Sequence, residues 1–244
     1  MNSLSFFYWA GMTTINPRQE IEEALAIGRE LGNDKIIAQS LTNLGRNEDV
    51  AGNYSKARSL LEESLDIGQK LGPEYMMENI VTKNFLGDVV WHQGDLKEAR
   101  LLYEECAGAL KDIHDQNFLA YTVRRLAQIA CRQGEFEEAA LLCGESLSVN
   151  RGLSDQRGMV ACLSAFADIA TARGKFVLAA QLFGAVESAL SGLGIRLLHS
   201  DEMIYYSNIT ALREKLDQKT LEKVWAKGAA MSLDEAIAFA LEEI

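Results

Sequence analysis

Proline is scarce in this chain of 244 residues, with Pro17 and Pro73 the only two. Proline interrupts helices, whereas the recurrent Ala, Leu and Glu favour them, so long helices are expected rather than strands. Long apolar runs are also missing, since no uninterrupted stretch of 18 apolar residues is available to span a membrane. The apolar stretch at residues 4–12 has no basic residue before it, which is not the charge pattern of a secretory signal.

Basic residues are few: 24 Lys and Arg stand against 35 Asp and Glu, a formal net charge of −11. Nucleic acids and anionic membranes are bound by clusters of Lys and Arg, so neither is expected as a direct partner. A protein or peptide partner is expected instead. Only four cysteines occur and none has Cys-x-x-Cys spacing, which favours small apolar core residues in a reduced, cytoplasmic chain: Cys106, Cys131, Cys143 and Cys162.

A repeated turn pattern runs through the middle of the chain. Its four glycines are 42, 40 and 40 residues apart: Gly52, Gly94, Gly134 and Gly174. Two residues after each glycine comes a large apolar or aromatic residue (Tyr54, Leu96, Phe136, Phe176), and five residues after it comes Ala57, Ala99, Ala139 or Ala179. Seven residues before each glycine stands a small residue, with the same spacing: Gly45, Gly87, Ala127 and Ala167. Two features in one register across four copies indicate a helical repeat.

Each copy is interpreted as two antiparallel helices, A and B. In the second copy, helix A is predicted over Met76–His92 and helix B over Leu96–Ile113. The glycine between them can adopt the left-handed conformation that ends helix A and reverses the chain. The small residue of helix A and the alanine of helix B allow the two helices to approach closely. One pair cannot bury its apolar faces alone, so stacked pairs are expected to form the core.

The pattern Leu-(Gly/Ala) followed by Gly-x-(Tyr/Leu/Phe)-x-x-Ala resembles the tetratricopeptide repeat over about residues 35–193. The period of about 40 residues exceeds the usual ~34 and overlaps the HEAT and armadillo range, but the Gly-aromatic-Ala turn favours the tetratricopeptide type. The resemblance implies an all-α fold, a right-handed α-α superhelix of antiparallel helix pairs. The whole chain, 1–244, is then expected to be one solenoid, with a truncated first repeat (1–34), four repeats (35–74, 75–115, 116–155, 156–195) and C-terminal capping helices (196–244).

Both ends depart from the pattern. Residues 18–34 are similar to the helix B segment 60–74, so an earlier repeat is expected, with its helix A shortened to Leu4–Met12. The aromatic run Phe6–Trp9 would either fold down as a cap or form a homodimer contact. At the other end, three helices are predicted over Asp201–Leu216, Thr220–Ala230 and Leu233–Glu243, the last with a capping box from Ser232 to Glu235.

The C-terminal 65 residues or so resemble the end of the repeat region in large bacterial transcriptional regulators of the LuxR/SARP type. The segments that carry this resemblance are 179–190, 225–228 and 231–238. It implies a bacterial regulatory context. Neither an ATPase part nor a DNA-binding part is visible, so those activities are not carried over.

Residues typical of enzyme chemistry do not converge. The histidines, His92, His114 and His199, are scattered and are interpreted as surface or helix-end residues, so no metal is expected. Phosphate-loop and dinucleotide-binding glycine patterns are incomplete, so no cofactor is expected. Paired glutamates recur at one position of helix B (Glu22-Glu23, Glu62-Glu63, Glu104-Glu105, Glu137-Glu138), which indicates a solvated outer face. The chain is therefore not expected to be an enzyme.

The resemblance places the functional surface on the concave side, lined by helix A. Its groove positions lie two residues before and after the helix A Leu or Phe: Thr42 and Arg46, Asn84 and Asp88, Arg124 and Gln128, Ser164 and Asp168. Residues four apart share one face of a helix, so each pair would project together, either into a binding groove or as an ordinary exposed polar face. Asn84 could bind a peptide backbone and Arg124 a carboxylate, with Trp91, Tyr121 and Arg46 completing the site. A non-catalytic protein- or peptide-binding scaffold, a sensor or adaptor of a bacterial regulator, is the leading hypothesis; a small-molecule-sensing domain is the alternative.

Overall fold

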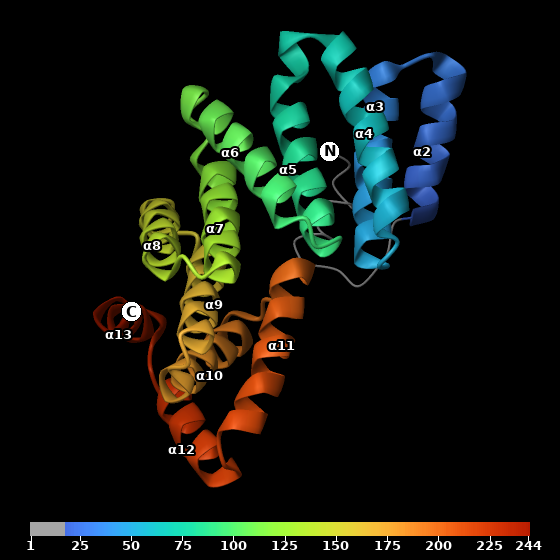
Figure 1. Cartoon of the computed structure of the whole chain (residues 1–244). Coiled ribbons are helices and arrows are strands. Elements are labelled where there is room, and N and C mark those ends of the chain that lie inside the picture. The colour runs from blue at the N-terminus through green and yellow to red at the C-terminus, as the bar shows by residue number, and fades with distance from the viewer. Residues whose placement is uncertain (1–17) are drawn as a thin grey trace. The chain divides into compact units, whose positions relative to one another are not determined.

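The computed structural model describes residues 18–244, and every α-helix and the one short 3-10 helix in that range is part of an all-helical arrangement (Figure 1). No strand occurs in residues 18–244. The predicted all-α helical-repeat fold is confirmed. The predicted helix over Leu4–Met12 and the aromatic run Phe6–Trp9 lie outside the described residues.

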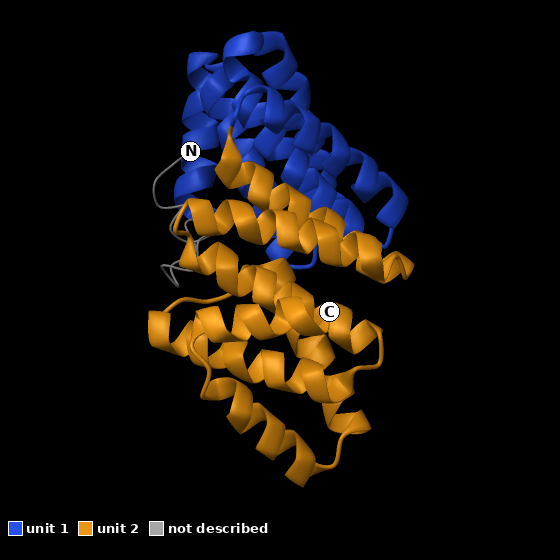
Figure 2. Cartoon of the chain, turned by 90° about the vertical axis from the view of Figure 1, so that its left-hand side faces the viewer, with its two compact units in different colours: residues 1–114 blue, residues 115–244 orange. Residues whose placement is uncertain are grey.

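The chain divides into two compact units, Met1–His114 and Asp115–Ile244, coloured separately in Figure 2. Within the described part, unit 1 contains α2 (Arg18–Leu31), α3 (Asp34–Val50), α4 (Tyr54–Leu71), the 3-10 helix η1 (Pro73–Tyr75), α5 (Met76–His92) and α6 (Leu96–Asp112). Unit 2 contains α7 (Gln116–Gln133), α8 (Phe136–Gly152), α9 (Gln156–Ala172), α10 (Phe176–Leu193), α11 (His199–Lys215), α12 (Gln218–Ala229) and α13 (Leu233–Glu243). Helix A of the second copy therefore has the predicted bounds, and helix B ends one residue earlier than predicted.

The repeat glycines do what their spacing predicts. Gly52, Gly94, Gly134 and Gly174 all have positive φ, between 75° and 93°. At Gly134 the backbone is left-handed (φ 82°, ψ 10°), and the amide of the next residue, Glu135, donates to the carbonyl of Ala130 at 2.9 Å. This bond caps α7 and turns the chain into α8.

A second left-handed position lies between successive repeats. Gly32 and Gly194 fill it with φ of 60° and 62°, but His114 and Ser154 hold the same conformation with φ of 57° and 55°. Left-handed backbone is costly for residues that carry a Cβ. This position has no constant residue type in the sequence, because only some of its members are glycines.

The small residues of helix A permit the predicted close packing of each pair. A Cβ built on Gly45 would lie 2.8 Å from the Leu61 side chain, and one on Gly87 would lie 2.8 Å from the Tyr103 ring. The alanines of helix B that face them are fully buried: Ala57, Ala99, Ala139 and Ala179.

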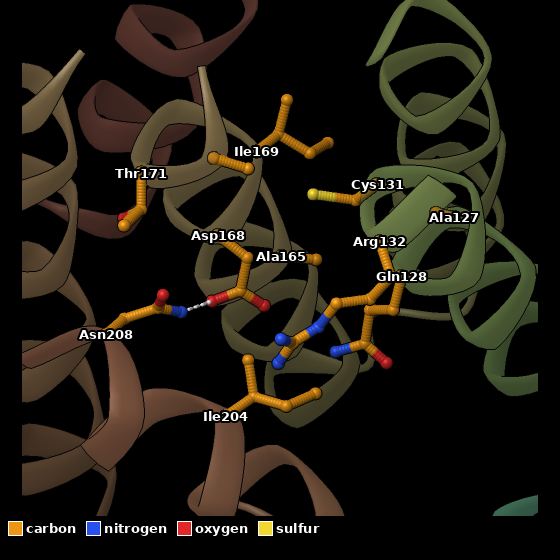
Figure 3. A pocket seen from close by; sticks show the side chains of 11 residues that line it. Ala127, Gln128, Cys131, Arg132, Ala165, Asp168, Ile169, Thr171, Ile204 and Asn208 are labelled. Atoms are coloured by element: carbon orange, nitrogen blue, oxygen red, sulfur yellow. Dashed lines mark hydrogen bonds between the residues drawn. The ribbon is translucent and has the colours of Figure 1, made fainter. Parts of the chain in front are cut away.

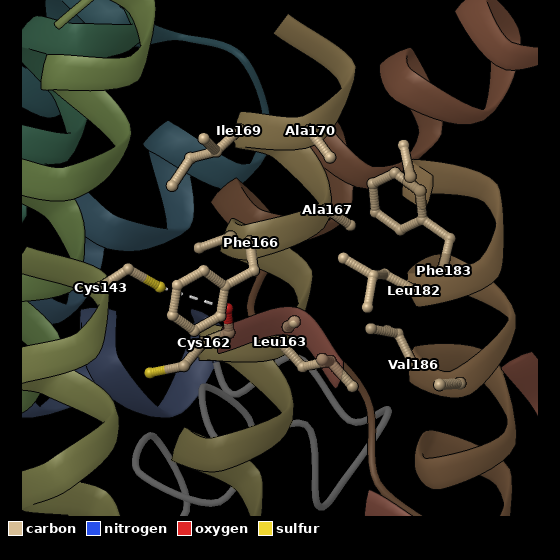
Figure 4. Packing of buried hydrophobic residues seen from close by; sticks show 14 of the residues in the cluster. Cys143, Cys162, Leu163, Phe166, Ala167, Ile169, Ala170, Leu182, Phe183 and Val186 are labelled. Atoms are coloured by element: carbon tan, nitrogen blue, oxygen red, sulfur yellow. Dashed lines mark hydrogen bonds between the residues drawn. The ribbon is translucent and has the colours of Figure 1, made fainter. Parts of the chain in front are cut away.

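The core of unit 2 is centred on α8, α9 and α10. Phe166 of α9 lies beside Cys143 of α8, while Leu182 and Phe183 of α10 pack on the other side of α9 (Figure 4). All four cysteines are buried, as predicted. Burial raises the pKa of the Cys106 thiol to about 12 and that of Cys131 to about 11, so neither has the thiolate character of a reactive cysteine.

The C-terminal helices follow the prediction with small shifts. α11 begins two residues earlier than expected, α12 begins after Asp217, whose side chain accepts from the Thr220 amide, and α13 has the predicted bounds. The capping box of Ser232 and Glu235 is confirmed. α12 crosses α10 at a point where backbones nearly touch: a Cβ on Gly228 would lie 1.7 Å from the carbonyl oxygen of Gln181.

One helix, α10, is long and apolar enough by composition to cross a membrane, although its sequence is not an uninterrupted apolar run. Leu182, Phe183 and Val186 of this helix are fully buried, and α10 packs against α9, α12 and α13. These contacts are those of a core helix.

Candidate functional site

Three side chains of α7 in unit 2 bind one carboxylate. Arg124 Nη1 donates to Asp201 Oδ1 at 2.5 Å, Arg125 Nη1 at 2.9 Å and Gln128 Nε2 at 3.1 Å. Arg124 and Gln128 are four residues apart and so share one side of α7. Asp201 lies in the first turn of α11, where the helix dipole also favours a negative charge.

This carboxylate cluster, Arg124, Arg125, Gln128 and Asp201, is buried throughout, with Asp201 only 2% exposed. Burial opposes the charged form of Asp201, but the two guanidinium groups and the hydrogen bonds outweigh it and hold its pKa below the usual range. The ring of Tyr121 lies beside both guanidiniums, with its centroid 5.6 Å from Arg124 Cζ and 4.9 Å from Arg125 Cζ. Arg124, Arg125 and Gln128 all bind Oδ1 of a carboxylate that the chain's own α11 supplies, and the buried Oδ2 accepts no hydrogen bond within residues 18–244.

A cavity of about 170 Å³ lies beside the cluster, between α7, α9 and α11. Its residues are Ala127, Gln128, Cys131, Arg132, Ala165, Asp168, Ile169, Thr171, Ala172, Ile204 and Asn208 (Figure 3). Asp168 is 8% exposed, and its Oδ1 accepts a hydrogen bond from Asn208 Nδ2 at 2.5 Å. Burial, and next the negative charge of Asp201, raise the pKa of Asp168 to about 8. The cavity thus has a buried acid in one wall.

In unit 1 the predicted groove residues bind side chains or main-chain groups of the same unit. Thr42 Oγ1 lies 2.8 Å from Ser64 Oγ and 2.9 Å from Thr82 Oγ1, which joins three helices through hydroxyl groups. Asn84 is fully buried and donates to the carbonyl of Ile80 at 3.1 Å. The structure brings Thr42 together with Thr82, a position that the prediction did not include.

Of the remaining unit 1 positions, Asp88 is buried, whereas Arg46 and Trp91 are partly exposed. The Tyr103 hydroxyl donates to Asp88 Oδ1 at 2.7 Å, and the guanidinium of Arg46 lies 4.0 Å from the centroid of the Phe85 ring. Arg46 and Trp91 are half-buried, as is Tyr121 in unit 2. Ser164 of α9 is buried. Seven of the eight groove positions are therefore buried, with Arg46 the partly exposed one, so they do not form an ordinary exposed polar face.

Several residues of the unit 2 site were absent from the predicted site residues, among them Arg125, Asp201 and Asn208. Arg125 is adjacent to a predicted position and is the largest fully buried side chain of the described residues, yet its charge suggested the surface. Asp201 and Asn208 belong to α11, which lies beyond the last repeat. No periodic signal connects α11 to α7, so only its placement in the fold could reveal them.

The histidines lie at the surface or at helix ends, as predicted. His92 is the last residue of α5; its side chain is buried, and its Nδ1 lies 2.7 Å from Asp49 Oδ1. His114 is at an exposed turn and His199 begins α11. Within residues 18–244, no group of three or more His, Cys, Asp or Glu side chains could hold a metal ion.

The paired glutamates lie on the outer face, as predicted. Glu62 and Glu104 are about half exposed, and each forms an ion pair with an arginine four residues earlier, Arg58 at 2.8 Å and Arg100 at 3.0 Å. The pairs repeat with the period of the helices. Such exposed pairs contribute little to stability and offer no buried carboxylate for acid or base chemistry.

The comparison with protein families matches a tetratricopeptide repeat at residues 37–73, the segment of α3 and α4. No curated protein matches the chain. Several solved structures do: the TPR-like repeats of a Podosopora anserina kinesin light chain (TM-score 0.56, 17% identity, 80% of this chain and 99% of that one) and BtubC from P. vanneervenii (0.57, 16%, 91% and 86%). A Rap protein complexed with competence and sporulation factor is also similar (TM-score 0.60, 16% identity, 91% of this chain and 63% of that one). Residues 37–73 therefore match a tetratricopeptide repeat, and they lie in an all-α helical-repeat fold that the chain shares with these solved structures.

Proposed function

We propose that this protein is a non-catalytic protein- or peptide-binding scaffold, a sensor or adaptor module of a bacterial regulatory protein that works in the cytoplasm without binding nucleic acid or membrane directly. The observation that carries the proposal is the binding of Asp201 by Arg124, Arg125 and Gln128. Two of these three are groove positions, and they hold an acidic side chain of a separate helix. The same chemistry would hold an acidic segment of a partner.

The fold supports this proposal. The Rap protein that shares it has been solved in complex with competence and sporulation factor. The net charge of −11 and the exposed glutamates of helix B disfavour a polyanionic partner. The resemblance of the C-terminal helices to bacterial regulators is the basis for the regulatory context.

In unit 2 the carboxylate cluster is satisfied by α11, so a partner that uses this site has to displace the start of that helix. In unit 1, Arg46 and Trp91 are the groove residues with exposed surface, and we assign them the first contacts with a partner. Asn84 and Arg124 are fully or almost fully buried. Changing either of them would alter stability as well as binding.

The test is capture of partners from an extract of the source cell on the immobilised full chain, followed by affinity measurement with the purified partner. Arg46→Ala and Trp91→Ala are expected to weaken binding at least about tenfold, as loss of an interface anchor does. The matched controls are Arg151→Ala and Leu141→Ala on α8, where both side chains are exposed. Binding that is equally strong in all four variants would contradict the assigned surface, and the absence of any partner that binds the purified chain would contradict the scaffold function.

Self-association through the N-terminal aromatic segment is part of the same proposal. Burying Phe6–Trp9 against a second copy would remove apolar surface from water. Deletion of residues 1–12 should shift the sedimentation coefficient toward the monomer. A full-length chain that is already monomeric at tens of micromolar protein would contradict the dimer and leave these residues as a cap.

A further inference from the structure

We propose that the cavity between α7, α9 and α11 binds a small free amino acid as its zwitterion. The ammonium group would lie at Asp168, the carboxylate at Arg132, and the side chain against Ile169 and Ile204. This inference concerns unit 2 alone and does not depend on the scaffold function.

The proposed acceptor for the ammonium group is the buried carboxyl group of Asp168. Asp168 is 8% exposed and faces the cavity in Figure 3. The ionised form of a buried carboxyl group is high in free energy unless a cation lies beside it. Its neighbours are Asn208 on α11, which donates one hydrogen bond, and Gln128, Arg124 and Arg132 on α7. Arg124 is already engaged by Asp201.

The opposite charge comes from Arg132. This residue lines the same cavity, its side chain is exposed, and it forms no hydrogen bond or ion pair with any residue in the range that the structure describes. In Figure 3 its guanidinium and the Asp168 carboxylate both point into the space between the helices. The Asp168 carboxyl group therefore provides an acceptor for an ammonium group, and the Arg132 guanidinium provides paired donors for a carboxylate.

The remaining surface is apolar. Ile169 and Ile204 lie on opposite sides of the space in Figure 3, and Ala127 and Ala165 complete the wall. A volume of about 170 Å³ corresponds to about six water molecules, at ~30 Å³ each. This is room for a ligand of about six to eight non-hydrogen atoms, the size of alanine or valine, and not for a peptide.

Burial of Asp168 also predicts how the ligand couples to protons. Its pKa of about 8 keeps the carboxyl group mostly protonated at neutral pH. An ammonium group would favour the ionised form and release that proton. Asp201, the other acid near Asp168, is held ionised by its arginines and does not take part.

The test is calorimetric titration of the full chain with glycine, L-alanine, L-valine and L-leucine, and with N-acetyl-L-valine and L-valinamide. We expect one of the small apolar amino acids to bind with a Kd between about 1 μM and 1 mM. Each blocked derivative should bind at least about tenfold more weakly, because one charged group is missing. The heat of binding at pH 7 should vary with the ionisation enthalpy of the buffer, as proton release requires.

Two substitutions locate the ligand, and two matched ones serve as controls. Asp168→Asn and Arg132→Gln should each lower affinity at least about tenfold, whereas Asp66→Asn and Arg213→Gln, at exposed positions that do not line the cavity, should not change it. Arg132 is exposed, so its variant should fold even if Asp168→Asn does not. The proposal is overturned if no amino acid binds, if the blocked derivatives bind as well as the free ones, or if affinity survives Arg132→Gln.

Discussion

Arg124 on α7 and Asp201 on α11 are 77 residues apart in the sequence, yet Nη1 of the arginine lies 2.5 Å from Oδ1 of the aspartate. Arg125 Nη1 binds the same oxygen atom at 2.9 Å. The contact fixes the start of α11 to α7. Arg124, which was predicted to bind the carboxylate of a partner, therefore binds the first turn of α11 instead.

Removal of this carboxylate should destabilise unit 2. Asp201→Asn leaves two buried guanidinium groups without their counter-charge, and breaking a buried pair costs about 3–5 kcal/mol. The neighbouring Glu202→Gln, which breaks the more exposed pair with Arg196, should cost at most about 1 kcal/mol. Urea unfolding of both variants measures the difference. Equal stabilities would mean that the buried cluster contributes no more than a surface pair.

The repeat turns should not tolerate β-branched residues. Gly94→Val and Gly134→Val place a Cβ at φ of 93° and 82°, which should cost about 1–3 kcal/mol each. Gly108→Ala, in the interior of α6 with no atom within 4 Å of the added Cβ, should instead be neutral or stabilise by up to about 1 kcal/mol. Thermal melting that is unchanged in both valine variants would contradict the role of these turns.

Two positions should gain stability from glycine. His114 and Ser154 hold left-handed backbone (φ 57° and 55°) where Gly32 and Gly194 occupy the equivalent turn. His114→Gly and Ser154→Gly should each raise the free energy of unfolding by about 0.5–1 kcal/mol, the relief of strain minus the added freedom of the unfolded chain. Leu153→Gly, next to Ser154 but at φ −85°, should lower it. A loss of stability in both glycine variants at 114 and 154 would show that these side chains contribute more than their strain costs.

The crossing of α10 and α12 should be intolerant of a single methyl group. Gly228→Ala would place Cβ 1.7 Å from the carbonyl oxygen of Gln181, and this backbone atom cannot rotate away. Overpacking of this kind costs about 1–3 kcal/mol or more. Gly192→Ala, in α10 with free space around it, is the matched control. Protection of α12 amides from hydrogen exchange should fall in the first variant and not in the second.

Asp168 should make stability depend on pH. Its pKa is about 8 in the folded state against an ordinary value of 3.8. Between these values the folded state keeps a proton that the unfolded state has lost, so the free energy of unfolding falls as pH rises, by at most about 1.4 kcal/mol per pH unit. The contribution is complete below pH 4 and is lost above pH 8.

Asp168→Asn removes this titration. Its stability relative to the parent chain should therefore increase between pH 5 and pH 8, whereas Asp66→Asn, at an exposed position, should give a difference that is flat with pH. The measurement is the urea unfolding midpoint of the parent chain and of both variants between pH 5 and pH 8. A constant difference for Asp168→Asn would mean that the carboxyl group titrates near its ordinary value.

The features that could be read from the sequence are local ones. Gly94 ends α5 because only a residue without a Cβ adopts that backbone cheaply, and Gly87 faces Tyr103 because helix pairs need one small residue where they cross. Ser232 and Glu235 cap α13 through atoms three residues apart. These interactions recur with a period of about 40 residues or act within one turn, so a single sequence displays them.

The surroundings of the candidate site were not accessible in this way. The resemblance to the tetratricopeptide repeat placed Arg124 and Asp168 among the groove positions, but it predicted neither their burial nor the residues that contact them. Asp201 and Asn208 reach them only because α11 folds onto α9 after the last repeat. The helices, their turns and the faces that pack could be predicted from the sequence, since each depends on residues within a few positions. The partner of Arg124, the cavity beside Asp168 and the crossing at Gly228 were decided by the tertiary structure alone, because they join segments 40 to 77 residues apart whose meeting depends on the path of the whole unit.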